Sequence, residues 1–318
     1  MWSNFGAAAF LSFVKYDSQT NLRVLHVPTA PIQTNQETFR SLSAKHIDNI
    51  EEHTCTHDHL ISPSLSRRKI FGTAATIVLF QPWTSSPADA ITSSEAETSY
   101  DTYAKNYDAL DGGSLSNSLG IEDARAKLLQ SARGRVLEIG VGTGLNLGKY
   151  KFSSSPDASD GVSSLTLVDI SDGMMSEAKE KLNSLTVPSH VEIKFVKADA
   201  TADLVQLFGS GGYFDTVVDT FSLCVMGNDG AKRCLEQMQN VVKKDSGKIL
   251  LIENTRSSNA ALGFYQDLTA DAAAKMGGKG CVSNQNARSF IQNTPGLDLI
   301  SEEEFAAGVF RMFVCKRV

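Results

Sequence analysis

Short apolar runs alternate with helical patterns along residues 91–318, and the first ninety residues lack this regularity. Apolar residues recur at helical spacing in four segments, which predicts helices over residues 121–132, 174–182, 232–242 and 260–276. Apolar runs between them predict strands over residues 135–139, 164–169, 191–196, 214–218 and 248–253. This alternation is typical of a parallel, doubly wound sheet. Residues 308–316 alternate apolar and polar positions and predict a final edge strand.

Residues 1–90 predict a targeting presequence rather than a folded domain. A hydroxyl-rich stretch precedes a basic step at residues 66–69, an apolar run at 70–80 and the A-x-A sequence of 88–90, which is the order of a signal with a cleavage site. A signal that follows a long polar segment resembles the bipartite presequences of plastid proteins. It predicts that the protein is located in the chloroplast, and within the chloroplast in the thylakoid. A mitochondrial presequence with a short inner-membrane anchor is the alternative, and a core helix of an amino-terminal domain is the third interpretation.

The apolar run bears on membranes as well as on targeting. It is shorter than the about 20 residues that a spanning helix needs. We therefore expect residues 70–83 to associate with a membrane only if the presequence is not cleaved, and we expect residues 91–318 to form the functional domain.

Charge and cysteine content exclude several classes of function. Residues 1–90 carry equal numbers of basic and acidic side chains, so the net charge of −6 belongs to residues 91–318. An acidic domain without a dense basic run is a poor match for nucleic acid. The five cysteines are widely spaced and form no CxxC pair, which argues against a disulfide framework or a zinc ribbon.

One cluster in the presequence has metal-binding residue types. His53, Cys55, His57 and His59 alternate with other residues, but no second cluster completes a closed site. We expect no bound metal.

A glycine-rich turn follows the first predicted strand. Gly140, Gly142 and Gly144 can adopt positive φ and leave the main chain open to a ligand. We expect a helix to start after them and to point its free N–H groups at that ligand, at the carboxyl ends of the parallel strands. Leu145 stands where the dehydrogenase fingerprint needs a glycine, and neither a Y-x-x-x-K sequence nor a P-loop is present.

Two longer motifs surround this turn. Residues 138–144, EIGVGTG, resemble the first motif of class I S-adenosylmethionine-dependent methyltransferases. Residues 168–179, VDISDGMMSEAK, resemble the second motif of the UbiE and methyltransferase-11 type, and residues 223–225 and 280–281 look like the Oms1 and thiol-methylating methyltransferase-like groups. The resemblance implies an α/β, Rossmann-like class I methyltransferase fold with a mostly parallel seven-stranded sheet, helices on both faces, and S-adenosylmethionine as cofactor.

The resemblance also implies roles for individual residues. Glu138 would orient the loop or meet the cofactor's amino group, and the three glycines would face its methionine and ribose. Asp169 would accept both ribose hydroxyls, Ile170 and Met174 would pack near the adenine, and Asp199 with the next residue would reach the adenine amino group. The implied cofactor residues are Glu138, Gly140, Gly142, Gly144, Asp169, Ile170, Met174, Asp199 and Ala200.

The methyl acceptor is less well defined by the sequence. Residues 219–222, DTFS, lack the prolines of many amine and nucleobase methyltransferases, and His190, the one histidine of the domain, precedes the third strand, away from the expected pocket. The residues at 242–247 and 253–254 depart from the family pattern. Candidates for a catalytic or pocket role are Tyr103, Tyr107, Phe221, Cys224, Glu253 and Asn254.

Three classes of function fit these observations. The first is methyl transfer to a small-molecule acceptor of the quinone, phenol or thiol type. The alternatives are a protein methyltransferase and a non-catalytic assembly or scaffold protein with the methyltransferase fold.

Overall fold

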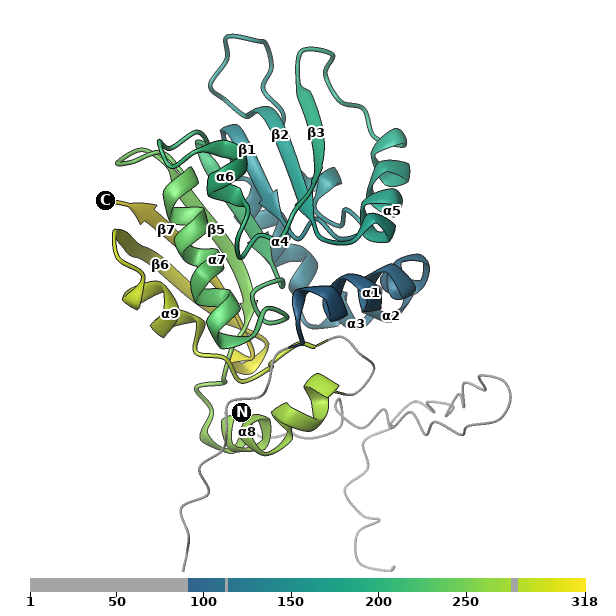
Figure 1. Ribbon diagram of the computed structural model, residues 1–318, viewed down its shortest axis with the longest axis vertical. Helices are drawn as coiled ribbons and strands as arrows, with labels where there is room; N and C mark the ends of the chain where they lie inside the picture. Colours follow the sequence, from purple (N-terminus) through teal and green to yellow (C-terminus); the bar gives the residue numbers. More distant parts are fainter. Residues whose placement is uncertain (1–90, 112–113, 276–279) are drawn as a thin grey trace, which may run out of the picture. The chain divides into compact units, whose positions relative to one another are not determined.

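A single mixed sheet of seven strands organises the residues that the computed structural model describes, 91–111, 114–275 and 280–318 (Figure 1). The strands lie in the order β3-β2-β1-β4-β5-β7-β6. β1 to β5 pair in parallel, and β7 is antiparallel to both β5 and β6. Their bounds are β1 Gly134–Ile139, β2 Val162–Asp169, β3 Glu192–Lys197, β4 Thr216–Thr220, β5 Lys248–Asn254, β6 Leu297–Phe305 and β7 Phe310–Arg317. This topology confirms the Rossmann-like class I methyltransferase fold.

Helices cover both faces of the sheet. One apolar cluster joins α6, α7 and α9 to one face, and a second joins α4 and α5 to the other. The helices are α1 Ser93–Tyr103, α2 Tyr107–Asp111, α3 Ser114–Ser118, α4 Ile121–Leu129, α5 Asp172–Asn183, α6 Leu204–Phe208, α7 Gly227–Val241, α8 Ala260–Lys275 and α9 Ala287–Asn293. In the part of the chain with described placement, no helix combines the length and hydropathy needed to cross a bilayer.

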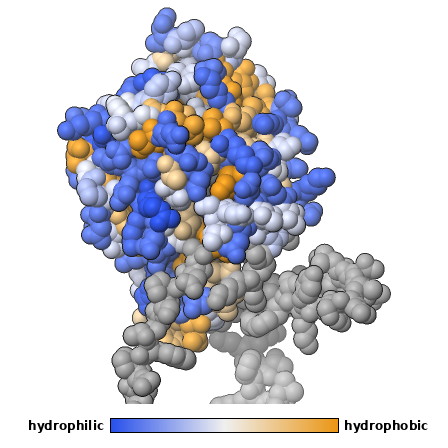
Figure 2. Space-filling view, viewed as in Figure 1, coloured by the Kyte–Doolittle hydropathy of each residue, from blue (hydrophilic) through white to orange (hydrophobic). Residues whose placement is uncertain are grey.

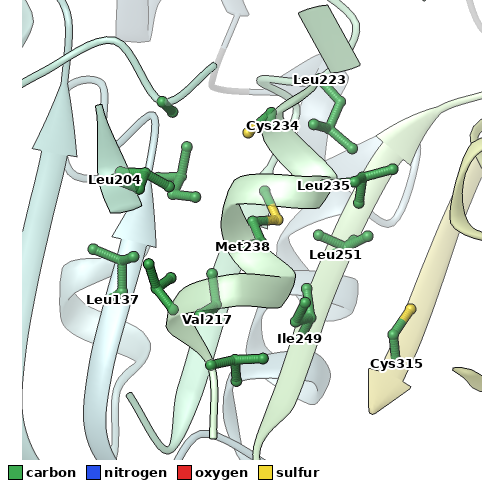
Figure 3. Packing of buried hydrophobic residues seen from close by; sticks show 14 of the residues in the cluster. Leu137, Leu204, Val217, Leu223, Cys234, Leu235, Met238, Ile249, Leu251 and Cys315 are labelled. Atoms are coloured by element: carbon green, nitrogen blue, oxygen red, sulfur yellow. The ribbon is translucent and has the colours of Figure 1, made fainter. Parts of the chain in front are cut away.

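The packing of α7 illustrates how the pattern of apolar residues fixes a helix on the sheet. Leu235, Met238 and Val241 recur at three-residue spacing and are fully buried. Figure 3 shows Leu235 and Met238 pointing at residues of β4 and β5, among them Val217 and Leu251. Each such side chain contributes about 1.5–3 kcal/mol on burial, so this face, rather than the intrinsic helix propensity of α7, determines its position.

The surface is mostly polar on the face drawn in Figure 2. Hydrophilic residues predominate there, and hydrophobic residues form small groups between them. The predicted targeting motifs at residues 70–80 and 88–90 and the cluster of His53, Cys55, His57 and His59 lie outside the described residues.

The final strand is not the edge of the sheet, contrary to the prediction for residues 308–316. β7 lies between β5 and β6, and β6 forms the edge. β6 contains three consecutive glutamates, residues 302–304, and a bulge between Leu299 and Ser301, so its pattern lacks a regular alternation. Edge strands use charges and bulges to avoid pairing with other chains. The same features interrupt the apolar pattern, so the sequence did not predict β6.

The expected helix after the glycine turn is also absent. Only a single 3-10 turn, Leu147–Lys149, follows Gly144. Leu147 is buried in the core, and the Ser153 N–H already donates to Val162 O in a bridge beside the start of β2. The few residues between these two anchors leave no room for a longer helix.

Candidate cofactor and acceptor site

A cavity of about 470 Å³ lies at the carboxyl ends of β1, β2 and β4. Its size falls within the usual range for small-molecule sites. The glycine turn, the end of β2, the turn after β3 and the first residues of α1 contribute to its wall. Seven of the nine predicted cofactor residues line this cavity: Gly140, Gly142, Asp169, Ile170, Met174, Asp199 and Ala200. The topology therefore brings together residues that the sequence separates by sixty positions.

Asp169 connects the two motifs directly. Its Oδ2 accepts a hydrogen bond from the Gly142 N–H at 2.8 Å, and its Oδ1 accepts from the Ser171 N–H at 2.9 Å. The carboxyl is 8% exposed, and burial raises its pKa above the ordinary value. Each carboxylate oxygen has a second lone pair, so Asp169 can hold the glycine turn and still accept hydroxyl groups from a ligand in the cavity.

Two glycines of the turn meet different requirements. Gly142 has φ +55, and a Cβ placed there would have only the Gly140 carbonyl oxygen within 4 Å, at 3.9 Å. A side chain at position 142 would therefore project into the cavity. Gly144 does not line the cavity, and a Cβ there would lie 2.5 Å from Leu147 Cδ1. Gly144 thus serves packing rather than ligand access.

Glu138 lies behind the cavity wall instead of on it. The carboxyl is 1% exposed and accepts hydrogen bonds from Tyr150 Oη at 2.7 Å and Asn146 Nδ2 at 2.9 Å. Burial raises the pKa of Glu138 to about 7. Of the two roles predicted for this residue, the geometry favours orientation of the loop over contact with the cofactor's amino group.

Helix α1 supplies a wall that the sequence motifs did not indicate. Thr92, Ser93 and Tyr100 line the cavity, and Ser93 Oγ donates to Asp199 Oδ2 at 2.6 Å. α1 begins with a capping box in which Thr92 and Glu95 exchange hydrogen bonds. The Thr-x-x-Glu spacing was the available signal for this start.

Asn228 is a second cavity residue that the sequence reasoning missed. It lines the cavity near the start of α7, and its buried Oδ1 has no hydrogen-bond partner among the described residues. A buried polar atom without a partner is costly, so a ligand donor at this position would be favourable. Together with the open space at Gly142 and the free lone pairs of Asp169, this group fits an adenosyl cofactor with amino and hydroxyl groups.

A smaller cavity of about 210 Å³ adjoins the first. Tyr100, Tyr107, Phe221 and Val225 line both, so the two spaces share one wall. The residues that line the second cavity alone include Arg125, Cys224, Asn254 and Cys281. Four of the predicted acceptor candidates, Tyr107, Phe221, Cys224 and Asn254, are therefore gathered here. Tyr103 and Glu253 line neither cavity.

Arg125 places a cation in the wall of the second cavity. Its Nη1 donates to Thr220 Oγ1 at 2.7 Å and to Asn146 Oδ1 at 2.8 Å, and its guanidinium lies 5.1 Å from the centre of the Phe221 ring. The side chain is nearly fully buried, and its Nε has no hydrogen-bond partner among the described residues. Nothing in the apolar spacing of residues 121–132 distinguished this arginine from a solvent-exposed one.

Two buried carboxyl groups support the loop over the cavities. Glu253 accepts from the backbone N–H groups of Leu223 and Cys224 at 3.2 and 3.3 Å. Burial raises the pKa of Asp219 to about 6, and burial together with the neighbouring Asp219 charge raises the pKa of Glu253 well above its usual value. Glu253 therefore holds the backbone of residues 223 and 224 in place from outside the cavities.

The comparisons with known proteins agree with this geometry. Residues 136–245 match the model of the "Methyltransferase domain" family. The chain is 26% identical over 204 residues to the Saccharomyces cerevisiae protein "Methyltransferase OMS1, mitochondrial". The match covers 61% of this chain and 40% of that protein, so the chain spans less than half the length of the curated relative it matches.

Solved structures share the fold at low sequence identity. The cyclase SpnF matches with a TM-score of 0.51 and 14% identity, over 73% of this chain and 98% of that one. The N-methyltransferase NodS of Bradyrhizobium japonicum, solved with S-adenosyl-L-homocysteine, matches with a TM-score of 0.49 and 14% identity, over 70% and 98% of the two chains. With the family match, the topology and the cavity at the glycine turn taken together, the chain carries a class I S-adenosylmethionine-dependent methyltransferase domain.

Proposed function

We propose that the domain binds S-adenosylmethionine in the larger cavity and transfers its methyl group to a small-molecule acceptor in the smaller one. The observation that carries this proposal is the shared wall of Tyr100, Tyr107, Phe221 and Val225 between the two cavities. Methyl transfer is an in-line displacement, and its main requirement is that nucleophile and methyl group are held in line. Two adjoining cavities would place the cofactor and the acceptor next to each other, which supports the proposal.

The residues present favour an acceptor whose nucleophile ionises easily. When bound, the cofactor supplies an activated methyl group, so a phenolate or thiolate needs no strong base. The domain's single histidine, His190, contacts Ser153 and lines neither cavity. Arg125 instead offers a buried positive charge to an anionic oxygen or sulfur. We therefore infer an acceptor of the phenol, quinol or thiol type.

Two other functions remain as alternatives with distinct outcomes. A protein methyltransferase would accept a side chain in the smaller cavity, whose volume of about 210 Å³ suits a small group. A non-catalytic assembly protein would bind the cofactor without turnover. The likeness to a protein named as a cyclase illustrates that one fold supports several functions.

The cellular location stays a proposal as well. The yeast relative is named as a mitochondrial protein, which supports the mitochondrial alternative for the presequence of residues 1–90. The comparisons give the chloroplast prediction no support.

The test combines a binding and a turnover measurement on the full chain. Calorimetry with S-adenosylmethionine measures cofactor binding, and release of S-adenosylhomocysteine is then followed with a phenol, a thiol or a protein extract as acceptor. We expect release with a phenol or thiol and a loss of that release in Arg125→Leu, with Arg288→Leu as the control because the Arg288 side chain is exposed. Binding without release would favour the scaffold function, and release with the protein extract alone would favour the protein methyltransferase.

A further inference from the structure

Two thiols from distant parts of the chain meet in the wall of the smaller cavity. Cys224 Sγ lies 2.7 Å from Cys281 Sγ, although 57 positions separate the two residues. The Val282 N–H donates to Cys224 O at 2.9 Å, so the backbone also holds the two segments together. A disulfide bond measures about 2.04 Å, and the two sulfur atoms need only a small further approach to reach it.

The two thiols differ in access. Cys224 is 1% exposed, whereas Cys281 is half-buried, so a reactant from solvent reaches Cys281 first. Asn254 Nδ2 lies 3.1 Å from Cys281 Sγ and 3.6 Å from Cys224 Sγ and donates to both. The thiolate is the reactive form of a cysteine. The hydrogen bond with Cys281 and burial raise the pKa of the Cys224 thiol, so the buried Cys224 is the second thiol to react.

We propose that Cys224 and Cys281 form a reversible dithiol–disulfide couple whose redox partner is a low-molecular-weight disulfide of the oxidised glutathione class. The Cys281 thiolate attacks one sulfur of the small disulfide and releases the first small thiol. Cys224 Sγ then attacks Cys281 Sγ, and the Cys224 proton passes to the second small thiol as it leaves. The protein loses two protons and two electrons in all, and the small disulfide is reduced to two thiols.

The position of the couple connects it to both cavities. Cys224 lies in the loop that begins with Phe221, and Cys281 follows Gly280, where a Cβ would lie 2.5 Å from Ile91 Cδ1. Ile91 lines the cofactor cavity, and both cysteines line the acceptor cavity. A disulfide bridge would fix the loop that contains Cys224 against the segment that contains Cys281. In the proposed methyltransferase, this would restrict entry of the acceptor.

The first experiment tests the bond without any methyl transfer. The full chain is incubated with oxidised glutathione, its free thiols are blocked with N-ethylmaleimide, and its peptides are mapped by mass spectrometry. We expect a linked pair of peptides that contains Cys224 and Cys281 and disappears with dithiothreitol. Cys281→Ser should lack the pair, and Cys55→Ser, the matched control, should retain it.

A thermal measurement accompanies the mapping. The melting midpoint of the oxidised wild type should rise, because the bridge closes a loop of 57 positions, and that of Cys281→Ser should not. The proposal would be overturned if glutathione remained attached to Cys281 while the Cys224 thiol stayed free and reacted with maleimide. Complete maleimide labelling of both thiols under oxidising conditions would do the same.

A second experiment tests the effect on the acceptor and depends on the proposed function. With 4-nitrophenol as the acceptor, KM should rise about tenfold in the oxidised chain, which corresponds to about 1.4 kcal/mol, and dithiothreitol should restore it. Equal KM values in both states would refute the restriction of entry. A chain without any methyl transfer would contradict the proposed function alone, because the peptide map would still report the bond.

Discussion

At the scale of single residues, Asp169 holds the glycine turn and faces the cavity with the same carboxyl group. We expect Asp169→Ala to weaken binding of S-adenosylmethionine by about 1.5–3 kcal/mol, the usual value of a charge-assisted hydrogen bond. Calorimetry on the two proteins measures the difference. Asp172→Ala is the matched control, since Asp172 is an exposed acid at the start of α5 that pairs with Lys197. Equal affinities for Asp169→Ala and the wild type would rule out the assigned role.

Glu138 gives a second prediction, about the pH dependence of stability. Its pKa is about 7 in the folded protein, because burial disfavours the charge, against 4.5 as the ordinary value. A raised carboxyl pKa contributes stability that is fully present below pH 4.5 and is lost as the pH rises through 7. Over that interval the loss is about 3 kcal/mol.

The measurement compares unfolding by urea across this pH range in the wild type and in Glu138→Gln. The variant keeps a polar group next to Tyr150 and Asn146 but cannot ionise. The unfolding free energy of the wild type should therefore fall relative to that of the variant by about 3 kcal/mol as the pH rises from 4.5 to 7. A constant difference would mean that Glu138 does not titrate within the interval.

At the scale of elements, the first turn of α1 supports one wall of the cofactor cavity. The capping box of Thr92 and Glu95 fixes that turn, and Ser93 and Tyr100 extend from the same helix to the cavity. We expect Glu95→Ala to break the capping box, to speed hydrogen exchange of the first-turn amides of α1 and to lower the affinity for S-adenosylmethionine. Hydrogen exchange of the α1 amides measures the first effect, and calorimetry measures the second.

A neighbouring glutamate provides the control for this prediction. Glu97 lies on the same helix and forms an exposed ion pair with Lys197 at 2.7 Å, a type of contact that contributes little to stability. Glu97→Ala should therefore leave exchange of the first turn nearly unchanged. Faster exchange in both variants would show that general fraying of α1, and not the cap, determines the wall.

The parts of the fold that the sequence predicted well are those with strong periodicity. The buried parallel strands and α7 present continuous or regularly spaced apolar residues, so their existence follows from the pattern. The existence of β6 does not follow from the pattern, because an exposed edge strand tolerates the glutamates of residues 302–304. The single 3-10 turn at Leu147 does not follow from the pattern either, because it ends where Ser153 hydrogen-bonds to Val162, which is more distant in the sequence.

The candidate site divides in the same way. Residues within the two motifs, such as Gly142 and Asp169, were identified because their spacing reflects the main-chain geometry of one turn. Arg125 and Asn228 come from helices whose local sequence is ordinary, and only the sheet topology brings them to the cavities. Residues of that kind require the three-dimensional arrangement.

At the scale of the whole molecule, cofactor binding should stabilise the entire domain. Residues of β1, β2, β4, α1 and α7 line the cavity, so a ligand there would contact elements from both halves of the described chain. At one hundred times the dissociation constant, S-adenosylmethionine should add about 2.7 kcal/mol to the free energy of unfolding. Thermal unfolding with and without the ligand measures this, and Asp169→Ala should show a smaller shift at the same concentration.

The place of Ile91 has a consequence for maturation of the chain. This residue lines the cofactor cavity and packs against Gly280, directly behind the predicted cleavage sequence of residues 88–90. A peptidase that cuts after Ala90 would leave a new, charged amino terminus at the rim of the cavity, and one that cuts three residues later would remove part of the wall. The processing site would thereby determine how tightly the mature protein retains its cofactor.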